Sequence, residues 1–328
     1  MSYWLHVLDF YKYNCNNNND FLNKYTIINN IYYKDYINPY GLVVKNNDIV
    51  LCPDNNQNAE LSNMYNNNKL IAFRPGIIET KFILNYKYDF NLLHCTQNYE
   101  TNLKTNAGVY YKTEDRRKEV LDWYTDNFIE LILNSTYCSC YCILHSDLCL
   151  LSKLDLKQTI YNYSHLYKVI LQNSEGKKIL YVGNAVDSIK AGYKRDLQRV
   201  WKFKIPQFEM YYVKTPQTTL GMEYPHDSMI ETCDDIIKQI MDNYSDFDTA
   251  IFGCGAYGSS LINILRKKYA NKNLCYLGSD CFKMFGIKIK LQAWENDSLD
   301  VNKNELIDII EKLPIGCMNH PEKKYWNY

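Results

Sequence analysis

Residues 249–260 read TAIFGCGAYGSS, and this stretch decides the fold. The apolar run at 249–252 is typical of a buried strand, and the glycine-rich turn after it leads into a helix expected over 259–269. Parallel strands need a crossover connection, usually a helix, between one strand and the next. A strand, a glycine-rich turn and a helix in this order therefore predict part of a parallel sheet.

The same alternation continues on both sides of this stretch. Further strands are expected at 178–183, 207–213 and 274–277, and further helices at 189–201 and 229–244. Strands that alternate with such helices predict an α/β fold, with a doubly wound, mostly parallel, Rossmann-like sheet and helices on both of its faces. Sheets of this kind bind ligands at the carboxyl ends of their strands.

The chain upstream divides into two parts. Residues 1–68 contain runs of asparagine, with short apolar stretches at 41–44 and 48–51 that favour strands. From residue 69 onward a strand is expected at 70–73 and helices at 77–85 and 113–134. We therefore expect a small strand-containing N-terminal segment, 1–68, and a larger domain, 69–328, whose second Rossmann-like half spans 177–290.

Composition limits the partners and the compartment. The 37 basic and 37 acidic residues cancel to a net charge of zero, so we expect no nucleic-acid partner, which would need a positive field. Residues 1–13 do not resemble a signal peptide, and no apolar run is long enough to span a membrane. The 12 cysteines are then expected to be reduced, in a cytoplasm. The 31 tyrosines and the abundance of Asn, Ile and Lys indicate an AT-rich genome. If the source is a virus, the expected location is the host cytoplasm or the virion.

The glycine-rich turn at 253–258 is also a candidate binding site. Glycine lets the backbone approach a phosphate closely, and the start of the following helix offers N–H groups and the positive end of the helix dipole. The alternative is a tight turn that needs glycine for packing alone. A dinucleotide site is a further alternative, because Asp280 follows the next strand about where an acid would bind a ribose. Such a site, however, uses the turn after the first strand of its sheet.

Several motifs follow one another in the second half of the chain. A strand ending in VGNA is followed by SIK at 182–190, PQFE occupies 206–209, KTPQT occupies 214–218, and GCGAYG is followed by LG and FGIK at 253–288. In this order they resemble the V-S-P-F, S-I-K, P-x-F-E, K-T-x-Q-S/T, G-C-G-A-Y-G and L-G-G…F-G-I-K motifs of the GT-D-type glycosyltransferase family. Upstream, residues 74–79 (RPGIIE) match its R-x-G-x-x-E motif, and 106–110 (NAGVY) are similar to its N-x-G-F/I-Y turn.

This resemblance implies a function and a set of site residues. A glycosyltransferase of this family moves a sugar from a nucleotide-sugar donor to an acceptor, here a glycan or a protein. By their positions in the motifs, Glu79 and Arg74 are the expected catalytic residues. The residues expected to bind the nucleotide-sugar are Gly76, Asn106, Gly183, Asn184, Ser188, Lys190, Gly253, Gly255, Tyr257, Gly258 and Gly278.

The chain departs from the family at its metal site. In metal-dependent members an Asp and a Glu hold Mg²⁺ or Mn²⁺ on the diphosphate; here Ile77 replaces that Asp and only Glu79 remains. A metal cofactor is therefore not expected, although Glu79 is a candidate ligand. Ser279 replaces the second glycine of L-G-G, and Lys290-Leu291-Gln292 replaces the family's K-R-W. Two alternatives stay open: a catalytically inactive binding or structural protein, and an NAD-dependent oxidoreductase.

A last candidate pair precedes the helix expected at 229–244. His226 and Asp227 are an acid and a base next to each other, but neighbouring loop residues usually face apart. Asp227 is instead expected to be the N-cap of that helix, because a short acidic side chain accepts hydrogen bonds from the first turn.

Overall fold

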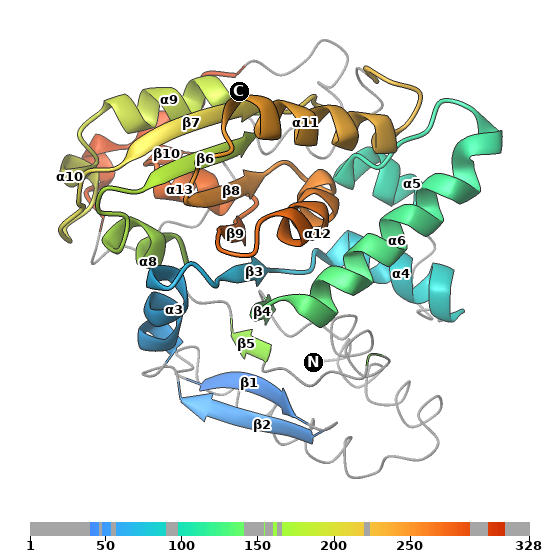
Figure 1. Ribbon diagram of the computed structural model, residues 1–328, viewed down its shortest axis with the longest axis horizontal. Helices are drawn as coiled ribbons and strands as arrows, with labels where there is room; N and C mark the ends of the chain where they lie inside the picture. The colour runs from blue at the N-terminus through green and yellow to red at the C-terminus, as the bar shows by residue number, and fades with distance from the viewer. Residues whose placement is uncertain are drawn as a thin grey trace.

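A computed structural model describes residues 40–45, 48–53, 57–89, 98–140, 154, 160–162, 166–219, 224–288 and 301–311. Its centre is a seven-stranded sheet in the order β5-β4-β3-β9-β8-β6-β7, in which each neighbouring pair is parallel (Figure 1). The strands are β3 (Ile71–Phe73), β4 (Tyr137–Cys140), β5 (Ile160–Asn162), β6 (Lys178–Gly183), β7 (Glu209–Lys214), β8 (Thr249–Gly253) and β9 (Asn273–Tyr276).

Helices cover both faces of this sheet. Those on one face are α4 (Ile77–Tyr88), α5 (Tyr99–Asn102), the π-helix η2 (Leu103–Ala107), α6 (Arg117–Asn134), α11 (Met229–Asn243) and α12 (Tyr257–Lys268). Those on the other face are α3 (Gln57–Asn66), α8 (Leu166–Gln172), α9 (Val186–Lys194), α10 (Leu197–Val200) and α13 (Asp280–Met284). The expected doubly wound, parallel α/β fold is confirmed.

Strand β6 shows why the buried strands could be predicted from the sequence. Leu180 and Val182 point into the cluster under α6, α11 and α12, whereas Ile179 and Tyr181 point into the cluster under α8 and α9. All four are buried. A strand covered on both faces must be apolar at every position, so it appears in the sequence as a continuous apolar run.

Near the N-terminus, β1 (Tyr40–Lys45) and β2 (Asp48–Pro53) form an antiparallel pair, which confirms the two strands expected there. Helix α3 also lies on the N-terminal side of the boundary expected at residue 68. Its Leu61 and Tyr65 are buried in the same core cluster as α8 and β6. The Asn273 side chain, in β9, donates a 2.9 Å hydrogen bond to the Tyr65 carbonyl. Residues 57–68 therefore pack into the larger domain.

The bounds predicted for the helix at 189–201 are wrong. Helix α9 begins at Val186, and the helical conformation is interrupted before α10 begins. Arg195 is extended (ψ 146°), and Asp196 begins a new helix by accepting a hydrogen bond from the Gln198 backbone N–H (3.0 Å). A capping side chain favours a new helix start over a continued one. Ser188 thus lies inside α9.

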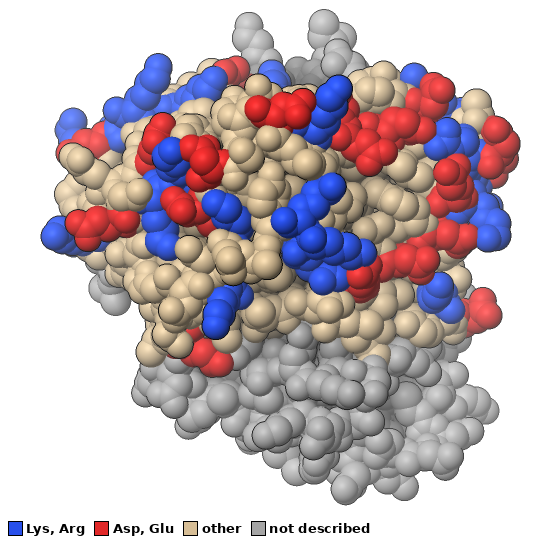
Figure 2. All heavy atoms as spheres, viewed as in Figure 1, with Lys and Arg blue, Asp and Glu red and all other residues tan. Residues whose placement is uncertain are grey.

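The surface of the described residues carries both signs of charge. On the face shown in Figure 2, basic and acidic side chains are interspersed, in keeping with the net charge of zero. Among the helices that the structure describes, none combines the length and the apolar character needed to cross a membrane.

Candidate functional site

Two glycines meet at the centre of the sheet's carboxyl edge. Gly183 ends β6, Gly253 ends β8, and the two are paired in register. A Cβ at Gly183 would lie 2.8 Å from the Gly253 carbonyl oxygen. After β6 the chain turns into α9 on one face of the sheet, and after β8 it turns into α12 on the other. Neighbouring strands that leave toward opposite faces form the switch point at which such sheets bind ligands.

The glycine-rich turn after β8 packs closely on other parts of the chain. Gly255 has a positive φ of 58°, and a Cβ there would lie 2.8 Å from the Ala107 carbonyl, which accepts a 2.9 Å hydrogen bond from the Ala256 N–H. A Cβ at Gly258 would collide with the Tyr276 ring. The packing alternative thus has a direct physical basis at these glycines.

Arg74 and Gly278 lie beside this turn. Arg74 follows β3, and its guanidinium carbon is 6.0 Å from the centre of the Tyr276 ring in β9. A Cβ at Gly278 would lie 3.2 Å from Arg74 Nη2, and a Cβ at Gly253 would lie 3.2 Å from the Gly278 carbonyl oxygen. A continuous set of contacts therefore links Arg74 to the end of β8.

Glu79 bends back toward the start of α4. Its carboxyl group occupies the space that a Cβ at Gly76 would need, which explains a glycine at that position. Burial raises the pKa of Glu79, and the positive charge of Arg74 offsets only part of that rise. The two expected catalytic residues are thus electrostatically coupled, in a half-buried place at the end of β3. A carboxyl group with a raised pKa is a common property of acid–base catalysts.

The remaining expected residues do not all lie at the carboxyl edge of the sheet. Tyr257 is buried at the start of α12, and half-buried Asn106 adjoins the Ala107 carbonyl that holds the glycine-rich turn. Asn184 directly follows Gly183. Lys190 lies elsewhere: its Nζ is 5.1 Å from the centre of the Tyr212 ring, part-way along β7 and away from the carboxyl edge.

Ser188 is buried and is already hydrogen-bonded to the carboxylate of another residue of the chain. Its backbone N–H donates a 2.9 Å hydrogen bond to Glu311 Oε1, and its hydroxyl donates to Glu311 Oε2. Sequence reasoning missed Glu311, because no local motif marks it.

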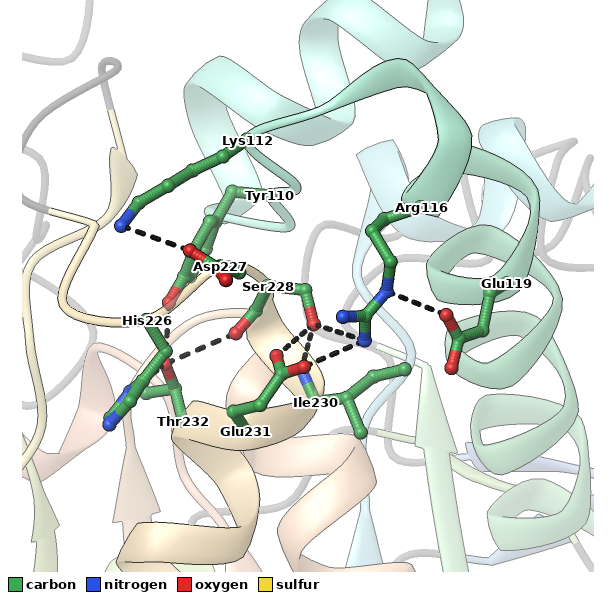
Figure 3. A network of polar contacts seen from close by, with 10 residues as sticks. All are labelled: Tyr110, Lys112, Arg116, Glu119, His226, Asp227, Ser228, Ile230, Glu231 and Thr232. Carbon is green, nitrogen blue, oxygen red and sulfur yellow. Dashed lines mark hydrogen bonds and ion pairs between the residues drawn. The ribbon is translucent and has the colours of Figure 1, made fainter.

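A polar network beside the site was also missed (Figure 3). Residues 110–112 lie against 227–229, with hydrogen bonds from the Met229 N–H to the Tyr110 carbonyl (3.0 Å) and from the Lys112 N–H to the Asp227 carbonyl (2.8 Å). Thr232 Oγ1 lies 2.5 Å from the Tyr110 hydroxyl and 2.9 Å from His226 Nδ1. The His226 ring therefore faces Thr232, whereas the Asp227 carboxylate pairs with Lys112 at 3.6 Å, and the two face apart as expected.

The N-cap of α11 is Ser228, so the prediction that Asp227 caps this helix is wrong. The Ser228 hydroxyl accepts a 3.2 Å hydrogen bond from the Ile230 N–H and also bonds the Glu231 carboxylate, which Arg116 contacts at 2.7 Å. Burial would raise the pKa of Glu231, but the Ser228 hydroxyl, its own backbone N–H and Arg116 lower it to about 2. Ser228-x-x-Glu231 matches the sequence pattern of a capping box, a signal that was readable in the sequence, although here the Glu231 carboxylate bonds the Ser228 hydroxyl.

Ser228→Ala is expected to lower the free energy of unfolding by about 1–2 kcal/mol, because it removes this cap. Asp227→Ala is the matched control. Its carboxylate is 76 % exposed in a 3.6 Å ion pair, so we expect a change below about 0.5 kcal/mol. Denaturant unfolding of both variants measures the difference. A larger loss for Asp227→Ala would show that Ser228 does not cap the helix.

Ile77 stands where the resemblance implies a metal-binding Asp; this residue is 41 % exposed, and its side chain offers only hydrocarbon. Across the described part of the chain, no three His, Cys, Asp or Glu side chains are grouped so that they could hold a metal ion. Asp280, the acid of the dinucleotide alternative, is buried (6 % exposed) at the first residue of α13.

Comparison of the chain with family models, with curated proteins and with solved structures found no match.

Proposed function

We propose that this protein transfers a sugar from a nucleotide-sugar donor to a glycan or protein acceptor at the carboxyl edge of its sheet. One observation carries the proposal. Residues expected to act together, from three separate parts of the sequence, lie along the carboxyl edge of the sheet: Arg74 and Glu79 after β3, Gly183 at the end of β6 and the glycine-rich turn after β8. Ligands of doubly wound sheets bind at this place.

Each residue has a role in this proposal. The Arg74 guanidinium stabilises negative charge on the departing diphosphate, because charge-assisted hydrogen bonds are strong in a half-buried site. The Glu79 carboxylate accepts the proton of the attacking acceptor hydroxyl or orients a sugar hydroxyl. The ends of β6 and β8 border the nucleotide. No step requires a metal ion.

The compartment belongs to the same proposal. Cys233, Cys254, Cys275 and Cys281 are buried thiols, and burial raises the pKa of each of them. Protonated, buried thiols suit a reducing compartment. We therefore propose a cytoplasmic location, or a host cytoplasm or virion for a viral source.

Thermal-shift measurements with UDP-, GDP- and dTDP-sugars and with NAD(H) test this function. A ligand that binds only the folded protein raises its melting temperature by mass action. We expect at least one nucleotide-sugar to do so, followed by turnover of that donor. A shift without turnover identifies a binding protein. A shift with NAD(H) alone would favour an oxidoreductase.

Chelation is expected to change little. Since Ile77 cannot coordinate a metal, donor binding and hydrolysis in EDTA should stay within about twofold of their values in Mn²⁺. Calorimetry and a donor-hydrolysis assay measure the two quantities. A strict requirement for Mn²⁺ would show that another acidic residue replaces the missing ligand.

A further inference from the structure

The segment 301–311 runs over α9 and α10 and is attached at several points. The Asn302 N–H donates a 2.8 Å hydrogen bond to the Val200 carbonyl, and β11 (Ile307–Asp308) pairs in parallel with β10 (Ile287–Lys288). Glu305 lies at the C-terminal end of α9, where its carboxylate contacts Arg195 at 2.7 Å and Arg199 at 3.0 Å. We call residues 301–311 the strap.

The strap reaches the opposite end of α9. There Glu311 accepts hydrogen bonds from both donors of Ser188, and the Ile310 N–H donates a 2.8 Å hydrogen bond to the Ser188 hydroxyl. Ser188 lies in the first turn of the nine-residue helix α9, where backbone N–H groups have no partner within the helix. An anion is thus already bound at this helix start, and it belongs to the protein itself.

This anion lies at the switch point. Helix α9 begins three residues after Gly183, the last residue of β6. The Glu311 carboxylate, bonded to Ser188 in the first turn of α9, therefore lies near the end of β6, which is directly beside β8. Its partner Ser188 is one of the residues expected to bind the nucleotide-sugar.

We infer that Glu311 imitates a phosphate group at the start of α9, and that a diphosphate-bearing ligand must displace the strap to bind there. The strap is then an autoinhibitory contact. The inference concerns regulation of the site in the proposed function and rests on it for the identity of the natural ligand. Its physical basis is competition: a site that is mostly occupied from within binds an external ligand with an affinity reduced by the open fraction.

Titration of the full chain with inorganic pyrophosphate, followed by calorimetry, tests the inference. Glu311→Gln keeps the side chain's shape and removes its charge, so we expect pyrophosphate to bind about tenfold more tightly than to the wild type. Asp242→Asn, at an exposed position on α11, removes the same charge elsewhere and should leave the affinity unchanged. Adding Ser188→Ala to Glu311→Gln should return the affinity toward the wild-type value.

A second measurement does not depend on a substitution. Hydrogen exchange of the wild-type protein should show faster exchange of the Ile310 amide when pyrophosphate is added, because the ligand frees it from Ser188. Unchanged exchange, or equal affinity of Glu311→Gln and wild type for pyrophosphate, would overturn the inference.

These experiments can support or overturn the autoinhibitory contact independently of the proposed function. If nucleotide-sugars are turned over while Glu311→Gln gains no affinity, the strap is a structural tie and the transferase proposal stands. If Glu311→Gln gains affinity for pyrophosphate while no nucleotide-sugar binds, the strap is inhibitory and the proposed function is wrong.

Discussion

Glu79→Gln is expected to lower donor turnover by about 100-fold or more while leaving nucleotide affinity nearly unchanged. Glutamine keeps the shape of the side chain over Gly76 but cannot accept a proton. The charge of the carboxylate is needed at the reacting group and not for holding the nucleotide, so the effect falls on turnover. Single-turnover kinetics and calorimetry on the same preparation separate the two quantities.

The raised pKa of Glu79 adds a pH dependence to this prediction. Wild-type turnover should fall as the pH drops through that raised pKa, because a protonated carboxyl cannot act as a base. For stability, a folded-state pKa above the unfolded value means that Glu79 stabilises the fold below the unfolded pKa and that this contribution is lost as the pH rises through the folded pKa. The melting temperature of Glu79→Gln should therefore rise relative to wild type as the pH increases.

A purely structural pair of Arg74 and Glu79 gives a different result. In that case Glu79→Gln would lose melting temperature at neutral pH and would change neither affinity nor turnover of the folded fraction. Unchanged turnover would remove Glu79 from the catalytic site.

Arg74→Ala is expected to weaken nucleotide binding by about 1.5–3 kcal/mol, which is roughly a 10- to 150-fold rise in Kd. The guanidinium lies near the Tyr276 ring and Gly278, half-buried beside the end of β8, where a charge-assisted hydrogen bond to a diphosphate is only partly screened by water. Calorimetry with the nucleotide found in the thermal-shift screen measures the loss.

Arg266→Ala is the matched control for Arg74→Ala. Arg266 lies in the last turn of α12 and contacts Glu130 at 2.7 Å. Its removal should lower the melting temperature slightly and leave nucleotide affinity unchanged. Equal losses of affinity in both variants would mean that the effect comes from stability, and Arg74 would then not contact the ligand.

The sequence by itself determined the class of the fold. Residues 178–183 were expected as a strand and form β6 with the same bounds, and the apolar spacing of 229–244 closely matches α11. Both signals are local: a doubly covered strand must be apolar throughout, and a helix on a sheet must repeat its apolar residues every three to four positions. The order of strand, glycine-rich turn and helix then leaves few topologies other than a parallel, doubly wound sheet.

Tertiary structure decided how the site is assembled. A sequence shows a glycine, but only the fold shows that the Tyr276 ring fills the space beside Gly258 and that the Glu79 carboxyl fills the space beside Gly76. Ser188 and Glu311 are 123 positions apart, and no pattern of period 2 or 3.6 connects them. Propensities and capping act over a few neighbouring residues, whereas the partner of a buried polar group is chosen by how distant segments pack, because an unpaired donor in the interior is costly.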